Sequence, residues 1–279
     1  MAAIDEQTIL ITGATDGLGK TVATDLARGG AAILLHGRNP EKGERVLEEI
    51  RTATGNDRIS YYNADFSSLA EVRGLAEAVG ADRDRLDVLI NNAGLGAGPD
   101  PEKRETGADG CELRLTVNYL APFLLTRELL PRLQAGARES GEARIVNVAS
   151  AAQRAIDFDD VMLERDYSGM RAYSQSKLAL VMFTFDLARE LAGSGVTVNA
   201  LHPASLMDTR MVREWFGQPR TTVEEGARYV ERLAIAPELK GVNGEYFDQG
   251  RSARAAEQAY DEPARRRLRE LTETWIGAA

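Results

Sequence analysis

The sequence is poor in the residues that build metal sites and disulfides. Cys111 is the only cysteine among 279 residues, so no disulfide can form within the chain and no cysteine cluster can bind a metal. The two histidines, His36 and His202, show no paired ligand spacing. We therefore expect no metal centre.

Positive charge is also scarce. The chain has 34 lysines and arginines against 43 acidic residues, which gives a net charge of −9 and a pI of about 5.0. Such a balance argues against a nucleic-acid surface. We expect a small-molecule partner, and an anionic cofactor would need a local positive site.

The beginning of the sequence resembles neither a signal peptide nor a membrane anchor. Residues Met1–Thr8 are short and acidic and lead directly into an apolar, strand-like run. The expectation is a cytoplasmic protein with no membrane partner.

Strand-like and helix-like segments alternate along the chain, without a repeat or a Gly/Ser linker. About seven strands are expected, and the alternation predicts an α/β fold: a Rossmann-type, doubly wound parallel sheet with helices on both faces. We expect one domain over 1–279, with a C-terminal helical tail at 255–279. The segment 204–220 is expected to be a substrate lid or a packed loop, because it carries the apolar residues Met207, Met211, Trp215 and Phe216.

A glycine-rich turn follows the first predicted strand, Thr8–Thr12. Gly13, Gly17 and Gly19 precede a helix that extends to Arg28. Glycine permits positive φ and close approach of a ligand, and the free N–H groups at a helix start attract anions. The pattern predicts a phosphate-binding loop; a tight turn without a ligand is the alternative.

The second predicted strand, Ala31–His36, ends in Gly37-Arg38-Asn39. In dinucleotide folds this position meets the adenosine ribose, and an acid there binds the 2′-hydroxyl of NAD. Here no acid is present, and Arg38 can bind a phosphate. We therefore favour NADP(H) over NAD(H), with a merely solvated Arg38 as the alternative.

Two more strand ends carry candidate polar groups. Asp65 can accept a hydrogen bond from an adenine amino group, or it can be the N-cap of a helix over Ser67–Val79. The run Asn91-Asn92-Ala93-Gly94 ends the fourth predicted strand, Leu86–Gly94. Its small residues leave space for a flat ring, and its amides can tie neighbouring strands together.

Four further residues suggest proton chemistry. Asn118 lies inside a predicted helix from Asp109 toward Leu133, and Ser150 ends a predicted strand, where parallel sheets place ligands. Tyr173 and Lys177 lie one helical turn apart. A lysine ammonium there would lower the pKa of the phenol and make the pair a general acid/base, although a plain surface pair is the alternative.

Taken in this order, these motifs resemble the short-chain dehydrogenase/reductase family, of its classical type, from about Thr8 to Phe247. The long spacing between Ser150 and Tyr173 and the C-terminal helix resemble the retinol-dehydrogenase-like branch. The membrane anchor of some members of that branch is not seen, so no retinoid substrate is implied.

The resemblance implies a catalytic tetrad of Asn118, Ser150, Tyr173 and Lys177. It also implies a homodimer or homotetramer, formed through the helices around Leu120–Leu133 and Tyr173–Leu191. The implied cofactor contacts are Gly13, Thr15, Asp16, Gly17, Leu18, Gly19, Arg38, Asn39, Asp65, Phe66, Asn92, Ala93, Gly94, Tyr173, Lys177, Pro203, Leu206 and Thr209.

The implied function is an NADP(H)-dependent oxidoreductase that interconverts a carbonyl and an alcohol on a small organic substrate. The alternatives are a silent nicotinamide-nucleotide-binding regulator, or an epimerase or dehydratase of the extended relatives. Two departures from the family pattern leave the nicotinamide contacts open. Ala204 stands where glycine is usual, and Thr209 comes one place late.

Overall fold

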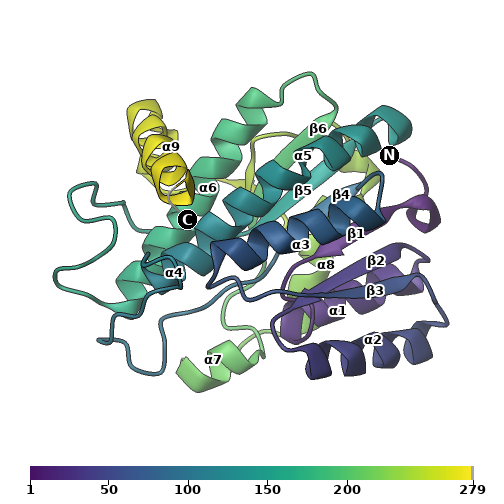
Figure 1. Cartoon of the computed structure of the whole chain (residues 1–279), viewed down its shortest axis with the longest axis horizontal. Coiled ribbons are helices and arrows are strands. Elements are labelled where there is room, and N and C mark those ends of the chain that lie inside the picture. Colours follow the sequence, from purple (N-terminus) through teal and green to yellow (C-terminus); the bar gives the residue numbers. More distant parts are fainter. Residues whose placement is uncertain (216, 278–279) are drawn as a thin grey trace.

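A computed structural model describes residues 1–215 and 217–277, and within that part the strands form a single sheet (Figure 1). The sheet has eight strands in the order β3-β2-β1-β4-β5-β6-β7-β8. Neighbours are parallel except β7 and β8, which are antiparallel. The strands are β1 (Thr8–Ile11), β2 (Ala32–Gly37), β3 (Ile59–Asn63), β4 (Val88–Asn91), β5 (Ala143–Val148), β6 (Val196–His202), β7 (Tyr246–Asp248) and β8 (Arg251–Ala253).

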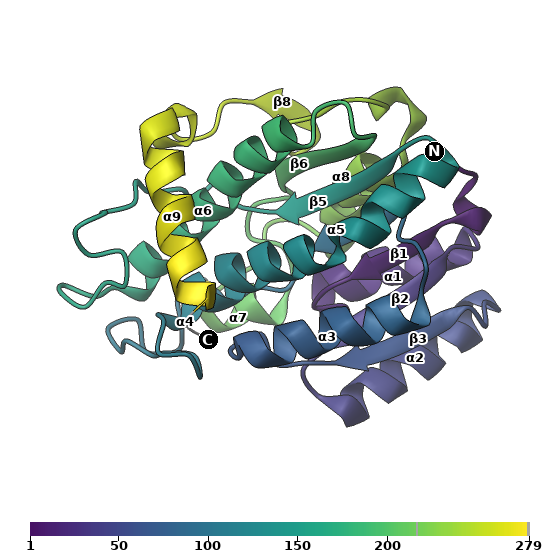
Figure 2. The ribbon, with the colours of Figure 1, turned by 45° about the horizontal axis from the view of Figure 1, so that its top comes forward.

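Helices cover both faces of this sheet (Figures 1 and 2). One core contains apolar residues of α3, α5 and α6, and the other contains those of α1, α2 and α8. The doubly wound α/β prediction is therefore confirmed. The helices are α1 (Gly17–Arg28), α2 (Pro40–Thr54), α3 (Leu69–Asp82), α4 (Leu113–Leu115), α5 (Ala121–Ser140), α6 (Gly169–Glu190), α7 (Arg210–Trp215), α8 (Val223–Ile235) and α9 (Glu262–Gly277).

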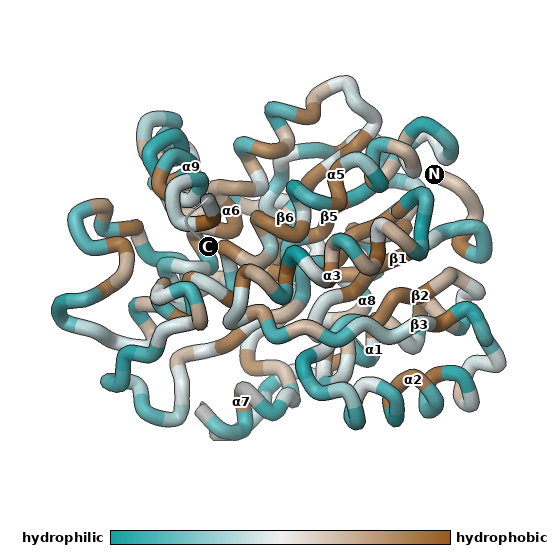
Figure 3. The backbone as a smooth tube through the Cα atoms, viewed as in Figure 1, coloured by the Kyte–Doolittle hydropathy of each residue, from teal (hydrophilic) through white to brown (hydrophobic). Residues whose placement is uncertain are grey.

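The central strands are apolar because both of their faces are covered. Residues 9–11 of β1 and 88–90 of β4 are completely buried, as parallel sheets require. Hydrophobic colour accordingly concentrates on the sheet, whereas the outer side of α2 is largely hydrophilic (Figure 3). In the described part of the chain, no helix combines the length and apolar character needed to cross a membrane.

Three details differ from the sequence-based expectations. The antiparallel strand β8 was missed because its three residues, Arg-Ser-Ala, carry no apolar run. The helix expected from Asp109 begins at Leu113 and contains a π-helical turn, Thr116–Leu120. The expected lid contains the short helix α7, and its Phe216 lies outside the described residues.

The C-terminal helix α9 lies across α6 (Figure 2). The Tyr119 hydroxyl is 2.7 Å from Thr272 Oγ1, and Arg265 forms an ion pair with Asp186 at 2.8 Å. Leu268 joins the core that also contains α5 and α6. The tail therefore forms part of the packed structure.

Three large apolar residues of α5 and α6 are buried by this packing. Phe123, Leu124 and Phe183 are 2–4% exposed within the single chain. Phe123 and Phe183 lie beside Leu268, where α5, α6 and α9 meet. Their apolar character is thus explained by the fold itself.

Candidate active site

The residues singled out above converge at the carboxyl edge of the sheet. Strands β1, β2, β4, β5 and β6 are parallel neighbours, so their carboxyl ends lie side by side. The glycine-rich turn follows β1, Arg38 follows β2, Asn92 follows β4 and Ser150 follows β5. Ligands of open parallel sheets bind at this edge.

The glycines of the turn are required by close packing against the end of β4. Gly13 has a φ of +64°, and a Cβ there would lie 2.8 Å from Cα of Ala93. A Cβ on Gly19 would lie 2.5 Å from Nδ2 of Asn92. This amide donates to the carbonyls of Thr12 at 2.8 Å and Gly13 at 3.1 Å. Asn92 therefore holds the turn in place.

The turn leads into the N-terminus of α1. Asp16 is the N-cap and accepts a hydrogen bond from the Gly17 amide at 2.9 Å. The side chain of Thr15 lies against Gly37, where a Cβ would be 2.5 Å from Cγ2 of Thr15. The turn thus contacts the end of β2, and Leu18 packs into the core behind it.

His36 stabilises the glycine-rich turn through a hydrogen bond, a role that the sequence did not predict. Its Nδ1 accepts a hydrogen bond from the Gly13 amide at 3.3 Å, and its Nε2 donates to the Ala64 carbonyl at 3.0 Å. Acceptance at Nδ1 requires the neutral ring, and burial lowers the pKa of His36 to about 4. Phe66, a predicted cofactor contact, stacks on this ring, with the two ring centroids 4.2 Å apart.

Charged groups gather where the adenosine ribose is expected. Arg38 is exposed, and Asn39 caps α2 by accepting from the Lys42 amide at 2.8 Å. Nζ of Lys42 pairs with Asp16 at 2.6 Å, and this hydrogen bond is the main cause that lowers the pKa of Asp16. Lys42 was not predicted, because its proximity to Asp16 arises only from the packing of α2 on α1.

Asp65 follows β3 and shapes a turn. Its Oδ1 accepts from the Ser67 amide at 2.9 Å, while Ser68 is the N-cap of α3 and accepts from the Glu71 amide at 3.3 Å. The N-cap interpretation of Asp65 is therefore wrong. Its contact with adenine stays a prediction.

Lys177, Asn118 and Gly94 form a close group at the centre of this edge. A Cβ on Gly94 would lie 3.2 Å from Oδ1 of Asn118 and 3.4 Å from Nζ of Lys177. Lys177 is 5% exposed, its Nζ donates to the Val148 carbonyl at 2.8 Å, and it lies 5.9 Å from the ring centroid of Tyr173. The structure thus brings these predicted site residues together.

Asn118 is fully buried in the π-helical turn. Its side chain accepts from the Leu95 amide at 2.7 Å and donates to Ser176 Oγ at 2.9 Å. Pro122, four residues on, has no backbone N–H, so the Asn118 carbonyl cannot receive the bond that an α-helix would make there. π-turns of this kind often occur at functional sites.

The side chains of Ser150 and Tyr173 interact. Burial raises the pKa of Tyr173, and the interaction with Ser150 lowers it, with burial the larger effect. The expectation that Lys177 draws this pKa down is not met, because burial dominates and the ammonium is directed at Val148. Burial lowers the pKa of Lys177 itself to about 8.

The segment after β6 contacts the cofactor turn. Cγ2 of Thr209 would lie 3.3 Å from a Cβ on Gly17, and Thr209 Oγ1 accepts from the Val212 amide at 3.3 Å. Leu206 has a positive φ of 51°, and Pro203 and Ala204 are buried. The late Thr209 therefore still lies beside the glycine-rich turn.

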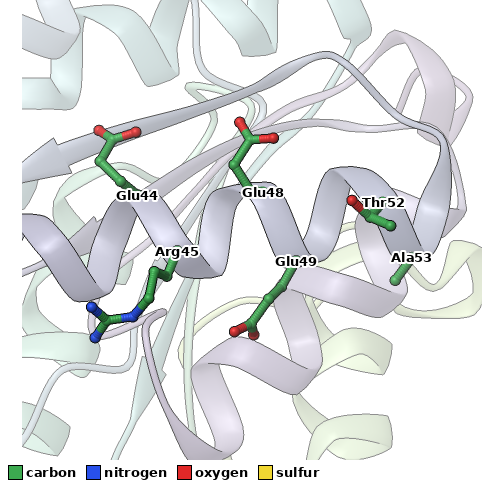
Figure 4. Close-up of a pocket in the computed structure, with 6 residues that line it drawn as sticks. All are labelled: Glu44, Arg45, Glu48, Glu49, Thr52 and Ala53. Atoms are coloured by element: carbon green, nitrogen blue, oxygen red, sulfur yellow. The ribbon is translucent and has the colours of Figure 1, made fainter.

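A shallow hollow also lies along α2, away from these residues (Figure 4). One helix supplies its whole lining, and no predicted site residue takes part: Glu44, Arg45, Glu48, Glu49, Thr52 and Ala53. We assign it no function. Among the described residues, no group of three metal-binding side chains occurs.

Comparison with known proteins agrees with this geometry. The family model described as short chain dehydrogenase matches residues 7–220. The chain is 39% identical to retinol dehydrogenase 13 of Homo sapiens, covering 96% of this chain and 83% of that protein.

Solved structures share the fold. A 3-ketoacyl-(acyl-carrier-protein) reductase from Brucella melitensis, complexed with NADH, is 28% identical with a TM-score of 0.71, covering 88% of this chain and 97% of that one. A short chain dehydrogenase from Shigella flexneri, complexed with NADP, is 26% identical with the same TM-score and the same coverage. The chain belongs to the short-chain dehydrogenase family and is an NAD(P)-dependent oxidoreductase acting on an alcohol or a carbonyl.

Proposed function

We propose that this enzyme is an NADP(H)-dependent oxidoreductase that interconverts a carbonyl and an alcohol on a small organic substrate, with Tyr173 as general acid and base. One observation carries the proposal: buried Lys177 lies 5.9 Å from the ring centroid of Tyr173, whose side chain interacts with that of Ser150, at the sheet edge that receives the glycine-rich turn. A proton donor, a hydrogen-bond donor and a cation thus converge next to a cofactor loop.

The residues present fit a nicotinamide dinucleotide. The amides at the start of α1 and the tight turn at Gly13 suit a pyrophosphate, and the absent side chain of Gly94 leaves room next to Asn118 and Lys177. When bound, the nicotinamide would supply or take up the hydride. Lys177 would hold its ribose, and Thr209 and Leu206 would cover it.

The chain's own residues would handle the proton. In the reduction direction, Ser150 donates a hydrogen bond to the carbonyl oxygen, and Tyr173 gives its proton to the developing alkoxide. A raised Tyr173 pKa keeps the phenol protonated near neutral pH, which is the form that can donate a proton in the reduction direction. The Asn118 carbonyl, without its α-helical donor, can hold a water that returns a proton through Lys177.

A preference for NADP(H) is supported by the charges after β2. Arg38 is exposed, and Lys42 reaches the same region from α2, where its ion pair with Asp16 is itself partly exposed. Together these two cations can bind a 2′-phosphate. No carboxylate stands at the end of β2 to bind a ribose hydroxyl in its place.

The substrate screen that tests this proposal measures loss of reduced-nicotinamide absorbance. The purified enzyme is incubated with NADPH or NADH and a panel of ketones and aldehydes, which includes all-trans-retinal because of the relative named above. Turnover with at least one carbonyl, abolished in Tyr173→Phe, supports the proposal. Tight NADPH binding without any turnover would favour the silent regulator, and a racemised or dehydrated product would favour the epimerase or dehydratase alternative.

Assembly into a homodimer or homotetramer is a further proposal. Because α9 occupies the side of α5 and α6 around Phe123, a second copy would have to use other exposed surface. Light scattering on the eluted protein would give the mass, and a monomer at micromolar concentration would contradict this proposal.

A further inference from the structure

The carbonyl of the candidate catalytic serine is held by side chains rather than by the sheet. The pairing of β5 with β6 ends at Val148 and Leu201, and the amide of Ala149 makes the next bond, to the Leu201 carbonyl, at 2.8 Å. Beyond it, the Ser150 carbonyl accepts two hydrogen bonds, from Gln153 Nε2 at 2.9 Å and from the Tyr246 hydroxyl at 3.1 Å.

Gln153 is fixed at both ends of its amide. Its Oε1 accepts from the backbone amide of Ala256 at 2.8 Å. A backbone amide can only donate and a carbonyl can only accept, so the two neighbours determine which way the Gln153 amide points. The side chain therefore connects the serine to Ala256, which lies 103 residues after Gln153 in the sequence.

We propose that Gln153 is a positioning residue for Ser150 and couples the segment 254–260 to the catalytic site. This inference rests on the proposed function, because it assigns Ser150 the role given above. Gln153 itself touches neither substrate nor reacting atoms in this assignment. It acts through the main chain of Ser150.

The direction of the Ser150 hydroxyl explains why such positioning matters. Ser150 Oγ accepts a hydrogen bond from the Ala152 amide at 3.1 Å, so its own proton is free to point at Tyr173 or at a substrate oxygen. The interaction with the Ser150 side chain lowers the pKa of Tyr173. If the Ser150 main chain moves, this interaction weakens, which reduces both transition-state stabilisation and the acidity of the phenol.

A second glutamine in the same region provides a matched control. Gln258 also makes two hydrogen bonds, accepting from the Ile156 amide at 2.6 Å and donating to the Ile156 carbonyl at 3.1 Å. It ties the same loop to the same C-terminal segment, yet it makes no bond to Ser150. Gln258→Leu and Gln153→Leu each lose two hydrogen bonds to the backbone, but only Gln153→Leu loses the contacts with Ser150 and with Tyr246.

The first measurement needs no substrate. Protein carrying ¹³Cζ-labelled tyrosine is titrated by NMR up to pH 10, with the Tyr173 signal identified by its absence in Tyr173→Phe. A net hydrogen bond of about 1 kcal/mol corresponds to roughly 0.7 of a pKa unit. We therefore expect the ionised fraction of Tyr173 at pH 10 to fall about fivefold in Gln153→Leu and to stay unchanged in Gln258→Leu.

The second measurement uses a carbonyl found in the screen. Gln153→Leu is expected to lower kcat about tenfold with KM for NADPH unchanged, whereas Gln258→Leu stays within about twofold of the parent. Gln153→Glu retains the acceptor for Ala256 but loses the donor to Ser150, so it should resemble Gln153→Leu. Circular dichroism at each pH checks that the variants are folded.

The outcomes separate the two proposals. A folded Gln153→Leu with an unchanged Tyr173 ionised fraction overturns the positioning role, whatever the activity. Equal losses of kcat in Gln153→Leu and Gln258→Leu would also overturn it, because they would indicate a general effect of the loop. An enzyme that turns over none of the carbonyls contradicts the proposed function, while the NMR comparison still decides the role of Gln153.

Discussion

The two halves of the carboxyl edge are held together by different kinds of contact. In the cofactor half, the turn after β1 packs directly against the ends of β2 and β4, with backbone atoms only 2.8 Å from where a Gly13 side chain would begin. In the substrate half, Ser150 and the loop after it are held by glutamine and tyrosine side chains from distant segments. The cofactor half depends on the absence of a side chain at Gly13, whereas the substrate half depends on the side chains of Gln153 and Tyr246.

This difference predicts that the two halves of the edge respond differently to substitution. A site held by close backbone packing tolerates almost no added atom, whereas a site held by hydrogen bonds loses its geometry gradually as bonds are removed. Four substitutions test that contrast, and they are given in order of decreasing expected effect.

Tyr173→Phe should have the largest effect. It removes the proton that the alkoxide would receive, and general acid catalysis contributes about 10²–10⁴-fold. We expect kcat to fall by roughly three orders of magnitude, with NADPH binding retained. Stopped-flow or steady-state absorbance gives kcat, and protein fluorescence gives NADPH affinity. Near-normal turnover in this variant would remove Tyr173 from its assigned role.

Gly13→Ala tests the cofactor half. The new Cβ would meet the Ala93 backbone at 2.8 Å in addition to the unfavourable φ of +64°. We expect NADPH affinity to fall at least tenfold, or about 1.4 kcal/mol, measured by isothermal titration calorimetry.

Gly55→Ala is the matched control for this variant. Gly55 has a φ of +70°, but nothing lies within 4 Å of the position of its Cβ. It should lose about 1 kcal/mol of folding stability through backbone strain without a change in NADPH affinity. Equal affinities for the two alanine variants would refute the close-packing explanation.

Lys42→Ala tests the charges around the adenosine ribose. Removing one of two cations available to a 2′-phosphate should raise KM for NADPH about tenfold while leaving KM for NADH within twofold. Lys20→Ala is the control, because the Lys20 side chain also joins α1 to α2, through an exposed pair with Glu49, but it forms no ion pair with Asp16. A parallel rise of KM for both cofactors would contradict the specific role of Lys42.

Glu231→Gln should give a smaller, pH-dependent effect outside the site. Glu231 on α8 contacts Asp25 on α1. The pKa of Glu231 is raised to about 7, mainly by burial and secondly by the negative charge of Asp25. The folded state thus holds a proton that the unfolded state releases near pH 4.5, so stability is lost as pH rises from about 4.5 to 7.

Gln cannot ionise. At pH values above about 7 the substitution should therefore raise Tm, whereas near pH 4.5 it should change Tm little. Because Glu231 is only partly buried, we discount the effect to the order of 1 kcal/mol at pH 8. Thermal melts at pH 5 and pH 8 measure it. An equal shift of Tm at both pH values would show that the carboxylate pair is not responsible.

The sequence was most informative where local signals agree with the fold. The helices α1 and α2 begin after side-chain caps, Asp16 and Asn39, and end at glycines, Gly29 and Gly55. The turn at Gly13 and the strand-end positions of Arg38 and Asn92 follow from the βαβ pattern. These features depend on residues close to each other in the chain.

The remaining features depend on contacts between distant segments. In the sequence, His36 is one more residue of an apolar strand. Only the pairing of β1 with β2 brings it within hydrogen-bonding distance of the Gly13 amide. Lys42 reaches Asp16 through helix packing, and Gln153 reaches Ala256 across 103 residues. The raised pKa of Tyr173 is likewise a consequence of burial, which residue spacing alone does not report.

The bond between Gln153 and Ala256 also has a consequence for folding. Segments that pair across a hundred residues must close a large loop before their contact forms, which slows folding and delays that contact. During synthesis, the ribosome makes Ser150 about a hundred residues before the segment that secures its loop. The cofactor half can therefore form on the nascent chain before the loop after Ser150 reaches its final geometry.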